Sequence, residues 1–133
     1  MNLFTPLSWN DAGFILTGVL NTIYISVVAV GIGTVSGLAV GFIRSAANGF
    51  INMVMGAFLD ILRTVPLIIQ LVLFSTWVGV IGWHLNPFIC GSIILSLNAM
   101  AFMAEVFRAG FESVSNSMRI TARSLGMGYW QSI

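Results

Sequence analysis

Residues 18–43 read GVLNTIYISVVAVGIGTVSGLAVGFI and contain no charged side chain. They lie inside an uncharged interval of 32 residues between Asp11 and Arg44. A helix needs about 20 apolar residues to cross a hydrocarbon core roughly 30 Å thick. The apolar residues form a continuous run and do not alternate with polar ones, which favours a helix over a strand of a transmembrane barrel. The stretch therefore predicts a membrane-spanning helix near 18–43.

The composition of the whole chain indicates the same environment. Of its 133 residues, 58% are apolar and 7% are charged, whereas soluble domains carry about 25% charged residues. Two further uncharged intervals of 20 residues each, on either side of His84, predict spans near 62–83 and 88–108. We expect a single all-α domain over residues 1–133, an integral membrane bundle of three spans in contact with lipid. The net charge of +1 gives no indication of a nucleic-acid partner.

The arginines predict how the chain is oriented. They flank the first connection or follow the third span: Arg44, Arg63, Arg108, Arg119 and Arg123. Because basic residues concentrate on the cytoplasmic side, we expect the N-terminus and the loop around His84 to face outward. No basic residue precedes the first apolar run, so a cleaved signal peptide is not expected.

Three glycines give the first span a flat face. Gly33, Gly37 and Gly41 are four residues apart and therefore share one side of a helix. Such a face lets another helix approach closely. Two interpretations are open: packing against another span of this chain, or an interface with a second subunit.

Polar residues and a proline in the second and third spans predict a candidate substrate path. Its members are Arg63, Pro66, Gln70, Asn98 and Glu105. Proline kinks or starts a helix, and broken helices often line transport routes. Asp60 is three residues before Arg63 and is placed to pair with it. The alternative for Gln70 and Asn98 is hydrogen bonding between helices, since a buried amide needs partners.

No arrangement of residues indicates catalysis. The chain has one His, one Cys and four scattered acidic residues, and it contains no metal-ligand spacing, catalytic triad or nucleotide-binding glycine loop. We expect neither enzyme activity nor a metal or cofactor, so any energy source must be a partner. His84 is expected in the interfacial belt beside Trp83, with a metal or proton role as the alternative. Cys90 is expected to be buried and inert.

Residues 118–133 predict an amphipathic helix on the cytoplasmic side. Wound as a helix, they place five apolar residues on one stripe: Met118, Ala122, Leu125, Tyr129 and Ile133. Arg119, Arg123 and Trp130 flank this stripe. Gly126 lies at its border and permits close backbone contact. Such a helix lies flat on the membrane surface or fills a groove on another protein.

Four segments, in order along the chain, resemble the permease subunits of ABC importers for polar amino acids of the histidine, glutamine and arginine uptake type. They are GVLNTIYIS (18–26), LRTVPLIIQLVLF (62–74), AFMAEVFRAGFESV (101–114) and LGMGYWQS (125–132). The second resembles the family's Arg-x-x-Pro-Leu-x-x-Gln-Leu stretch. The last is similar to its cytoplasmic coupling loop, the EAA loop.

The resemblance implies a dimeric channel in the bacterial inner membrane, built from identical or different permease subunits. It further implies a periplasmic substrate-binding protein that delivers the amino acid and cytoplasmic ATP-binding subunits that drive the channel. The coupling helix, 118–133, would contact the ATPase through seven residues: Met118, Ala122, Arg123, Leu125, Gly126, Tyr129 and Trp130. A permease for another solute, or a small three-helix accessory membrane protein without a substrate path, is the alternative.

The chain departs from the family pattern in two respects. Ile120, Thr121 and Ala122 replace the usual Glu-Ala-Ala, which implies weaker or altered coupling. The sequence also stops before the rest of the loop and the later spans of the family. We therefore expect a truncated permease, whether a fragment, a split gene or a disrupted reading frame.

Overall fold

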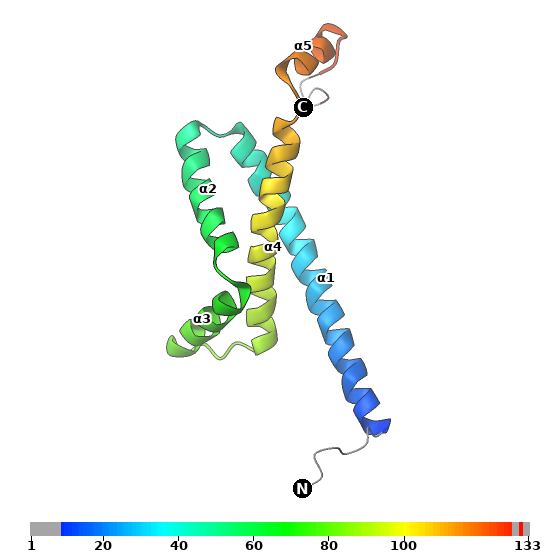
Figure 1. Ribbon diagram of the computed structural model, residues 1–133, viewed down its shortest axis with the longest axis vertical. Coiled ribbons are helices and arrows are strands. Elements are labelled where there is room, and N and C mark those ends of the chain that lie inside the picture. Colours follow the sequence, from blue (N-terminus) through cyan, green and yellow to red (C-terminus); the bar gives the residue numbers. More distant parts are fainter. Residues whose placement is uncertain (1–8, 129–130, 132–133) are drawn as a thin grey trace.

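The computed structural model describes residues 9–128 and 131, and the regular structure in that part of the chain is helical (Figure 1). Five helices follow one another: α1 (Trp9–Ala46), α2 (Gly49–Thr64), α3 (Leu67–Val80), α4 (Pro87–Glu112) and α5 (Asn116–Ser124). The all-α class expected from the sequence is confirmed. Two of the helices, α1 and α4, are each long and apolar enough to cross a membrane, and α2 with α3 adds a third span if the bent pair counts as one.

α1 packs against α4 along the three glycines of its second half. A Cβ atom added at Gly33 would lie 2.5 Å from the Cβ of Ala99, and one added at Gly37 would lie 2.6 Å from the Cβ of Met103. Gly41 is similarly close to the α4 backbone. The two helices therefore approach more closely than any larger residue would permit. The glycine face was expected to pack either against another span of this chain or against a second subunit. The contact with α4 is the first of these, packing within the chain.

The helix expected near 62–83 is divided in the structure. α2 ends at Thr64, α3 begins at Leu67, and the two helices are bent by 99° relative to each other. Pro66 explains the break, because it has no N–H to donate and clashes with helical geometry in the residue before it. That residue, Val65, is extended, with φ −74° and ψ 126°. The structure thus corrects one continuous helix to a broken one.

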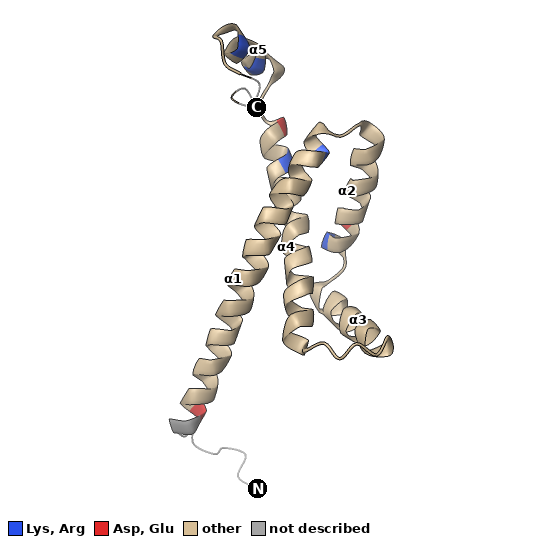
Figure 2. Cartoon of the chain, turned by 180° about the vertical axis from the view of Figure 1, so that it is seen from behind, with Lys and Arg blue, Asp and Glu red and all other residues tan. Residues whose placement is uncertain are grey.

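Charged residues gather toward one end of the molecule. In Figure 2 the basic residues of α5, of the last turn of α1 and of the C-terminal part of α4 lie at the upper end, beyond most of the apolar helix surface. Asp11, in the first turn of α1, lies at the opposite end. Arg63, in the last turn of α2, lies between the two ends. This is the asymmetry from which the orientation was inferred, and the orientation itself stays a prediction.

The chain buries few side chains. Leu59 of α2 packs with Ala101 and Ala104 of α4 in a small buried cluster, whereas most large apolar residues of α1, α2 and α3 are exposed. The ring of Tyr24 lies 5.7 Å from that of Phe88 at the start of α4, and the part of α1 before this contact extends past the other helices (Figure 1). Exposed apolar faces of this extent fit contact with lipid or with further membrane helices.

Gly37→Ala is expected to destabilise the chain, and Gly31→Ala serves as its matched control. Alanine at position 37 forces the two helices apart, at a cost of about 1–3 kcal/mol in the free energy of unfolding. At Gly31 an added Cβ has nothing within 4 Å, so alanine there gains helix propensity of about 1 kcal/mol. Unfolding of the purified protein in SDS, followed by circular dichroism, measures both changes. Equal effects of the two substitutions would contradict the packing described.

Candidate functional site

The break between α2 and α3 is closed by two side-chain amides. The last carbonyl groups of a helix have no partner within the helix, and lipid offers no hydrogen-bond donor in exchange. Gln70 of α3 donates through Nε2 to the carbonyl oxygens of Leu62 and Val65, at 2.7 Å in each case. Asn98 of α4 donates through Nδ2 to the same Leu62 oxygen at 3.2 Å. The carbonyl oxygens of Leu62 and Val65 at the end of α2 are therefore satisfied by amides, that of Leu62 from both neighbouring helices.

These contacts show what the side-chain amides of Gln70 and Asn98 bind in this structure. The sequence left Gln70 and Asn98 open between a substrate path and hydrogen bonding between helices. Both serve hydrogen bonding between helices, and Pro66 is the residue that makes them necessary. Each amide has further hydrogen-bonding capacity, because its oxygen remains available as an acceptor.

A single carboxylate, Glu105 of α4, joins three arginines from three helices. Its Oε2 lies 2.7 Å from Nη1 of Arg44 in α1 and 3.9 Å from Nη2 of Arg63 in α2. Its Oε1 lies 2.7 Å from Nη2 of Arg108, one turn further along α4. A buried charge is costly in a membrane unless it is paired. Arg44 is only 6% exposed, so Glu105 supplies the compensation that its burial requires.

The surroundings of the cluster balance its charge. Arg44 also donates through Nε to Oδ1 of Asn52 at 3.0 Å. Asp60 pairs with Arg63, as the spacing of the two residues predicted. Both carboxylate oxygens of Glu112 accept from Arg108, at 2.8 and 2.9 Å. Three arginines thus meet three acidic side chains, and the cluster has no net charge.

Sequence reasoning named part of this cluster and missed the rest. It included Arg63 and Glu105 in the candidate site but not Arg44, Asn52 or Arg108. The spacing of Glu105, Arg108 and Glu112 on one helix face carried a signal for Arg108. No local pattern links Arg44 to Glu105, because they are separated by 61 residues along the chain.

The helix expected over 118–133 is shorter in the structure. α5 begins after Ser115, whose side chain accepts from the N–H of Met118 at 3.4 Å, and it ends at Ser124. Gly126 terminates it with φ +85°, a left-handed conformation that favours glycine. The N–H groups of Gly126 and Met127 then bond back to Arg123 and Ala122, at 3.0 and 3.1 Å, which is the Schellman motif.

Gly126 therefore ends the helix, and an added Cβ there has nothing within 4 Å among the described residues, so its close approach to a partner stays a prediction. Of the predicted stripe, Met118 and Leu125 are 64% and 79% exposed, and Ala122 is half-buried. Arg123 lies in the last turn of α5. The remaining stripe members, Tyr129 and Ile133, lie outside the described residues, as does the flanking Trp130.

α5 is nearly free of contacts with the spans (Figure 1). Arg119 links it to α4, by donating through Nη2 to the carbonyl oxygen of Phe111 at 3.0 Å. The exposed apolar side chains of α5 are therefore available to a surface outside the described part of the chain.

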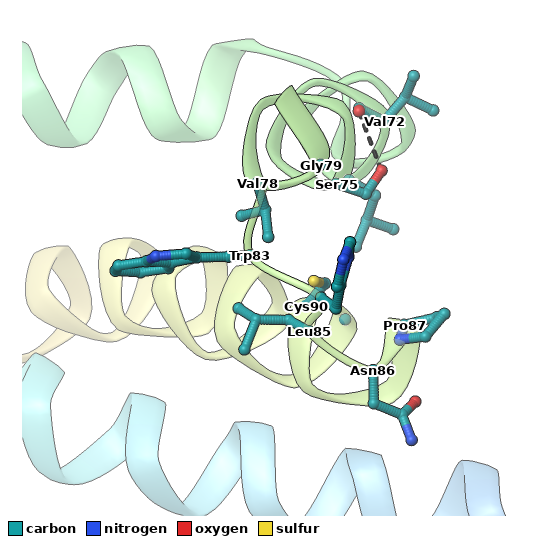
Figure 3. A pocket seen from close by; sticks show the side chains of 12 residues that line it. Val72, Ser75, Val78, Gly79, Trp83, Leu85, Asn86, Pro87 and Cys90 are labelled. Carbon is teal, nitrogen blue, oxygen red and sulfur yellow. Dashed lines mark hydrogen bonds between the residues drawn. The ribbon is translucent and has the colours of Figure 1, made fainter. Parts of the chain in front are cut away.

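A hollow of about 810 Å³ lies between α3 and the start of α4, at the end of the molecule opposite α5. Figure 3 shows Val78, Trp83, Leu85 and Cys90 around it. The Ser75 hydroxyl at its edge donates to the Val72 carbonyl oxygen at 3.0 Å. Cys90 is buried, as expected. Among the described residues no group of three or more His, Cys, Asp or Glu is placed to hold a metal ion.

Comparison with known protein families identifies the family of this chain. Residues 29–133 match the family described as "Binding-protein-dependent transport system inner membrane component". The match covers most of the chain, α5 included, so the chain belongs to this family. Its members are membrane components of transport systems and are not enzymes, which confirms the class implied by the resemblance.

Relatives of known annotation specify the class further. The chain is 30% identical over 118 residues to the probable glutamine ABC transporter permease protein GlnM of Bacillus subtilis, over 89% of this chain and 55% of GlnM. It is 29% identical over 130 residues to the glutamate/aspartate import permease protein GltK of Escherichia coli O6:H1, over 90% of this chain and 57% of GltK. The chain thus spans little more than half the length of these relatives.

A solved structure shares the fold. A chain from the crystal structure of an amino acid ABC transporter with histidines aligns with a TM-score of 0.78 and 26% identity, over 97% of this chain and 62% of that chain. The arrangement of α1 to α5 is therefore that of an ABC permease.

Glu105→Gln is expected to destabilise the chain by about 3 kcal/mol in the free energy of unfolding, because it leaves the buried Arg44 without its counter-charge. Glu112→Gln is the matched control. Among the described residues Glu112 pairs with Arg108 alone, and it is half exposed, so its loss costs less than about 1 kcal/mol. SDS unfolding of both variants measures the difference, and a Glu105 variant as stable as the Glu112 variant would refute the compensation.

Proposed function

We propose that this chain forms part of the membrane permease of an ABC importer for polar amino acids in the bacterial inner membrane. The observation that carries the proposal is the family match, which runs from the first span through α5. The names of GlnM and GltK, for glutamine and for glutamate and aspartate, support a polar amino acid as the substrate. Family membership also supports a permease over a small accessory membrane protein.

The partners follow from this proposal. A separate ATP-binding subunit drives the importer, a periplasmic binding protein delivers the substrate, and a second permease subunit, identical or different, completes the channel. The exposed apolar faces of α1, α2 and α3 are consistent with such assembly, since a lone chain has no described segment to cover them. The N-terminus lies outside and α5 lies in the cytoplasm, as the arginines predict.

α5 is the proposed contact with the ATP-binding subunit. It projects beyond the end of α4 and keeps its apolar side chains exposed (Figure 1). At 100° per residue, Met118 and Leu125 lie on one side of the helix and Ile120 lies on the other. A helix lying flat on a membrane would leave Ile120 in water, so a groove that encloses α5 accounts better for all three residues. The segment is thus suited to transmit motion between the two subunits.

The substrate path is proposed along the polar side of α2 and α4. Pro66 is exposed at the break, whereas Arg63, Gln70, Asn98 and Glu105 are half-buried. The guanidinium of Arg63 offers a hydrogen-bond donor to a substrate carboxylate, because its Nε has no hydrogen-bond partner among the described residues. In this arrangement Gln70 and Asn98 hold the shape of the break, and Arg63 is the member placed to meet the substrate.

Deletion of the gene for this chain in its own host is expected to lower the uptake of at least one of radiolabelled glutamine, glutamate, aspartate and arginine to the background of the strain. Uptake of leucine is expected to stay unchanged, because an apolar amino acid is not a substrate of the proposed path. Restoring the gene on a plasmid supplies the control. Unchanged uptake of every polar amino acid tested would contradict the proposed function.

Leu125→Asp is expected to abolish that uptake without lowering the amount of the chain in the membrane. The substitution places a charge in the proposed apolar contact, and Leu125 is exposed, so folding is not affected. Ser117 is exposed, on a part of α5 that carries none of Met118, Ile120 and Leu125. Ser117→Asp makes the same change in charge there. It should retain most of the uptake. Equal loss in both variants would show that α5 does not dock through its apolar side.

A further inference from the structure

Two hollows adjoin where α1, α4 and α5 meet. One has a volume of about 390 Å³ and lies between the last turn of α1, the last turn of α4 and the first turns of α5. The other has a volume of about 380 Å³ and lies along α1. Phe42 and Phe111 line both of them, and their rings meet edge to face at 5.7 Å. The two spaces are therefore neighbours across one aromatic pair.

The first hollow presents hydrogen-bond donors. Arg119 lines it, and the bond from its Nη2 to the Phe111 carbonyl oxygen holds the guanidinium in place. The Nε of the same guanidinium is buried and has no hydrogen-bond partner among the described residues. Ser45, Ser115 and Asn116 add hydroxyl and amide groups to the wall. A guanidinium with an unused donor is suited to a phosphate group.

The one acidic residue in this hollow is already compensated. Glu112 lines the wall, but both of its oxygens accept from Arg108, at 2.8 and 2.9 Å. The pair of Glu112 and Arg108 has no net charge, so Arg119 makes the hollow electrically positive. An anion is therefore favoured there over a neutral or cationic group.

The second hollow is apolar. Besides the two phenylalanines it is lined by Val35, Leu38 and Ala39. From Phe42 back to Val35 the helix covers two turns, roughly 10 Å along α1. The hollow therefore extends from the charged end of the molecule into its apolar part. A free phosphate ion would leave this space unused, whereas an acyl chain fits both its chemistry and its direction.

We propose that the two hollows together bind one anionic phospholipid, with its phosphate against Arg119 and an acyl chain along Val35, Leu38 and Ala39. Basic pockets at the cytoplasmic ends of membrane helices are suited to anionic head groups. The site joins the end of α1 to the start of α5, so the lipid would brace α5 against the spans. The inference depends on the membrane location of the chain and not on the identity of any transported solute.

Native mass spectrometry of the purified chain in detergent, with added phosphatidylglycerol or phosphatidylcholine of the same acyl chains, tests the proposal. The chain is expected to retain phosphatidylglycerol in preference. Arg119→Ala is expected to weaken that binding about tenfold, because it removes the charge-assisted contact with the phosphate. Arg123→Ala removes the same charge from the same helix, but Arg123 lines neither hollow, so it should change the binding little.

A second pair of variants tests the apolar part. Ala39→Phe fills the second hollow without changing charge, and Ala39 is exposed, so the fold should tolerate it. This variant is expected to lose phosphatidylglycerol, while Val30→Phe, elsewhere on the exposed surface of α1, should keep it. Equal retention of the two lipids, or equal effects of the two arginine variants, would overturn the proposal. So would displacement of the lipid by inorganic phosphate together with undiminished binding to Ala39→Phe, which would leave a phosphate site only.

Discussion

In a membrane every backbone carbonyl needs a hydrogen-bond donor from within the protein. At the break at Pro66, helical hydrogen bonding stops and other donors have to replace it. The proline removes a donor and bends the chain, and the freed carbonyl of Leu62 then receives two amide groups. One amide comes from α3, beyond the break, and the other comes from α4. Gln70 thus fixes the angle between α2 and α3, whereas Asn98 fixes the bent pair against the rest of the molecule.

α4 is the helix on which these constraints converge. One of its faces receives the glycines of α1, a second carries Asn98 at the break, and two turns later Glu105 contacts three arginines. The contacts lie at successive levels along the helix, so a shift of α4 would disturb all of them together. α4 also leads directly into α5 through Ser113 to Ser115. The segment proposed to meet the ATP-binding subunit is therefore a direct continuation of the helix that organises the polar interior.

What the sequence could predict depended on the range of the interaction. Uncharged intervals located α1 and α4, and the spacing of Gly33, Gly37 and Gly41 identified the face that α4 contacts. Both predictions were possible because each depends on residues that are close together in the sequence. The proline marked the break but not its size, since 99° depends on where Gln70 and Asn98 reach. Arg44 was not included in the candidate site because its partner Glu105 lies on another helix.

The coupling segment shows a different limit. Helical periodicity in residues 118–133 continues past Gly126, so the stripe alone predicted one long helix. The left-handed conformation of Gly126 ends α5 after Ser124 and turns the chain. A glycine that follows Arg in a last turn is itself a known stop signal, and it outweighs the stripe here because Met118 and Leu125 are exposed and do not pack on the described part of the chain.

The bend between α2 and α3 is tested most directly by a distance across it. Spin labels at Met53→Cys and Val80→Cys, in a Cys90→Ser background, occupy exposed positions on the two helices. A bend of 99° places their backbone positions roughly 26 Å apart, whereas one straight helix would place them roughly 41 Å apart. Double electron–electron resonance should give the short distance, and a broader, longer distribution when Gln70→Leu and Asn98→Leu are added. A long distance in the otherwise unaltered chain would contradict the bent span and the role assigned to both amides.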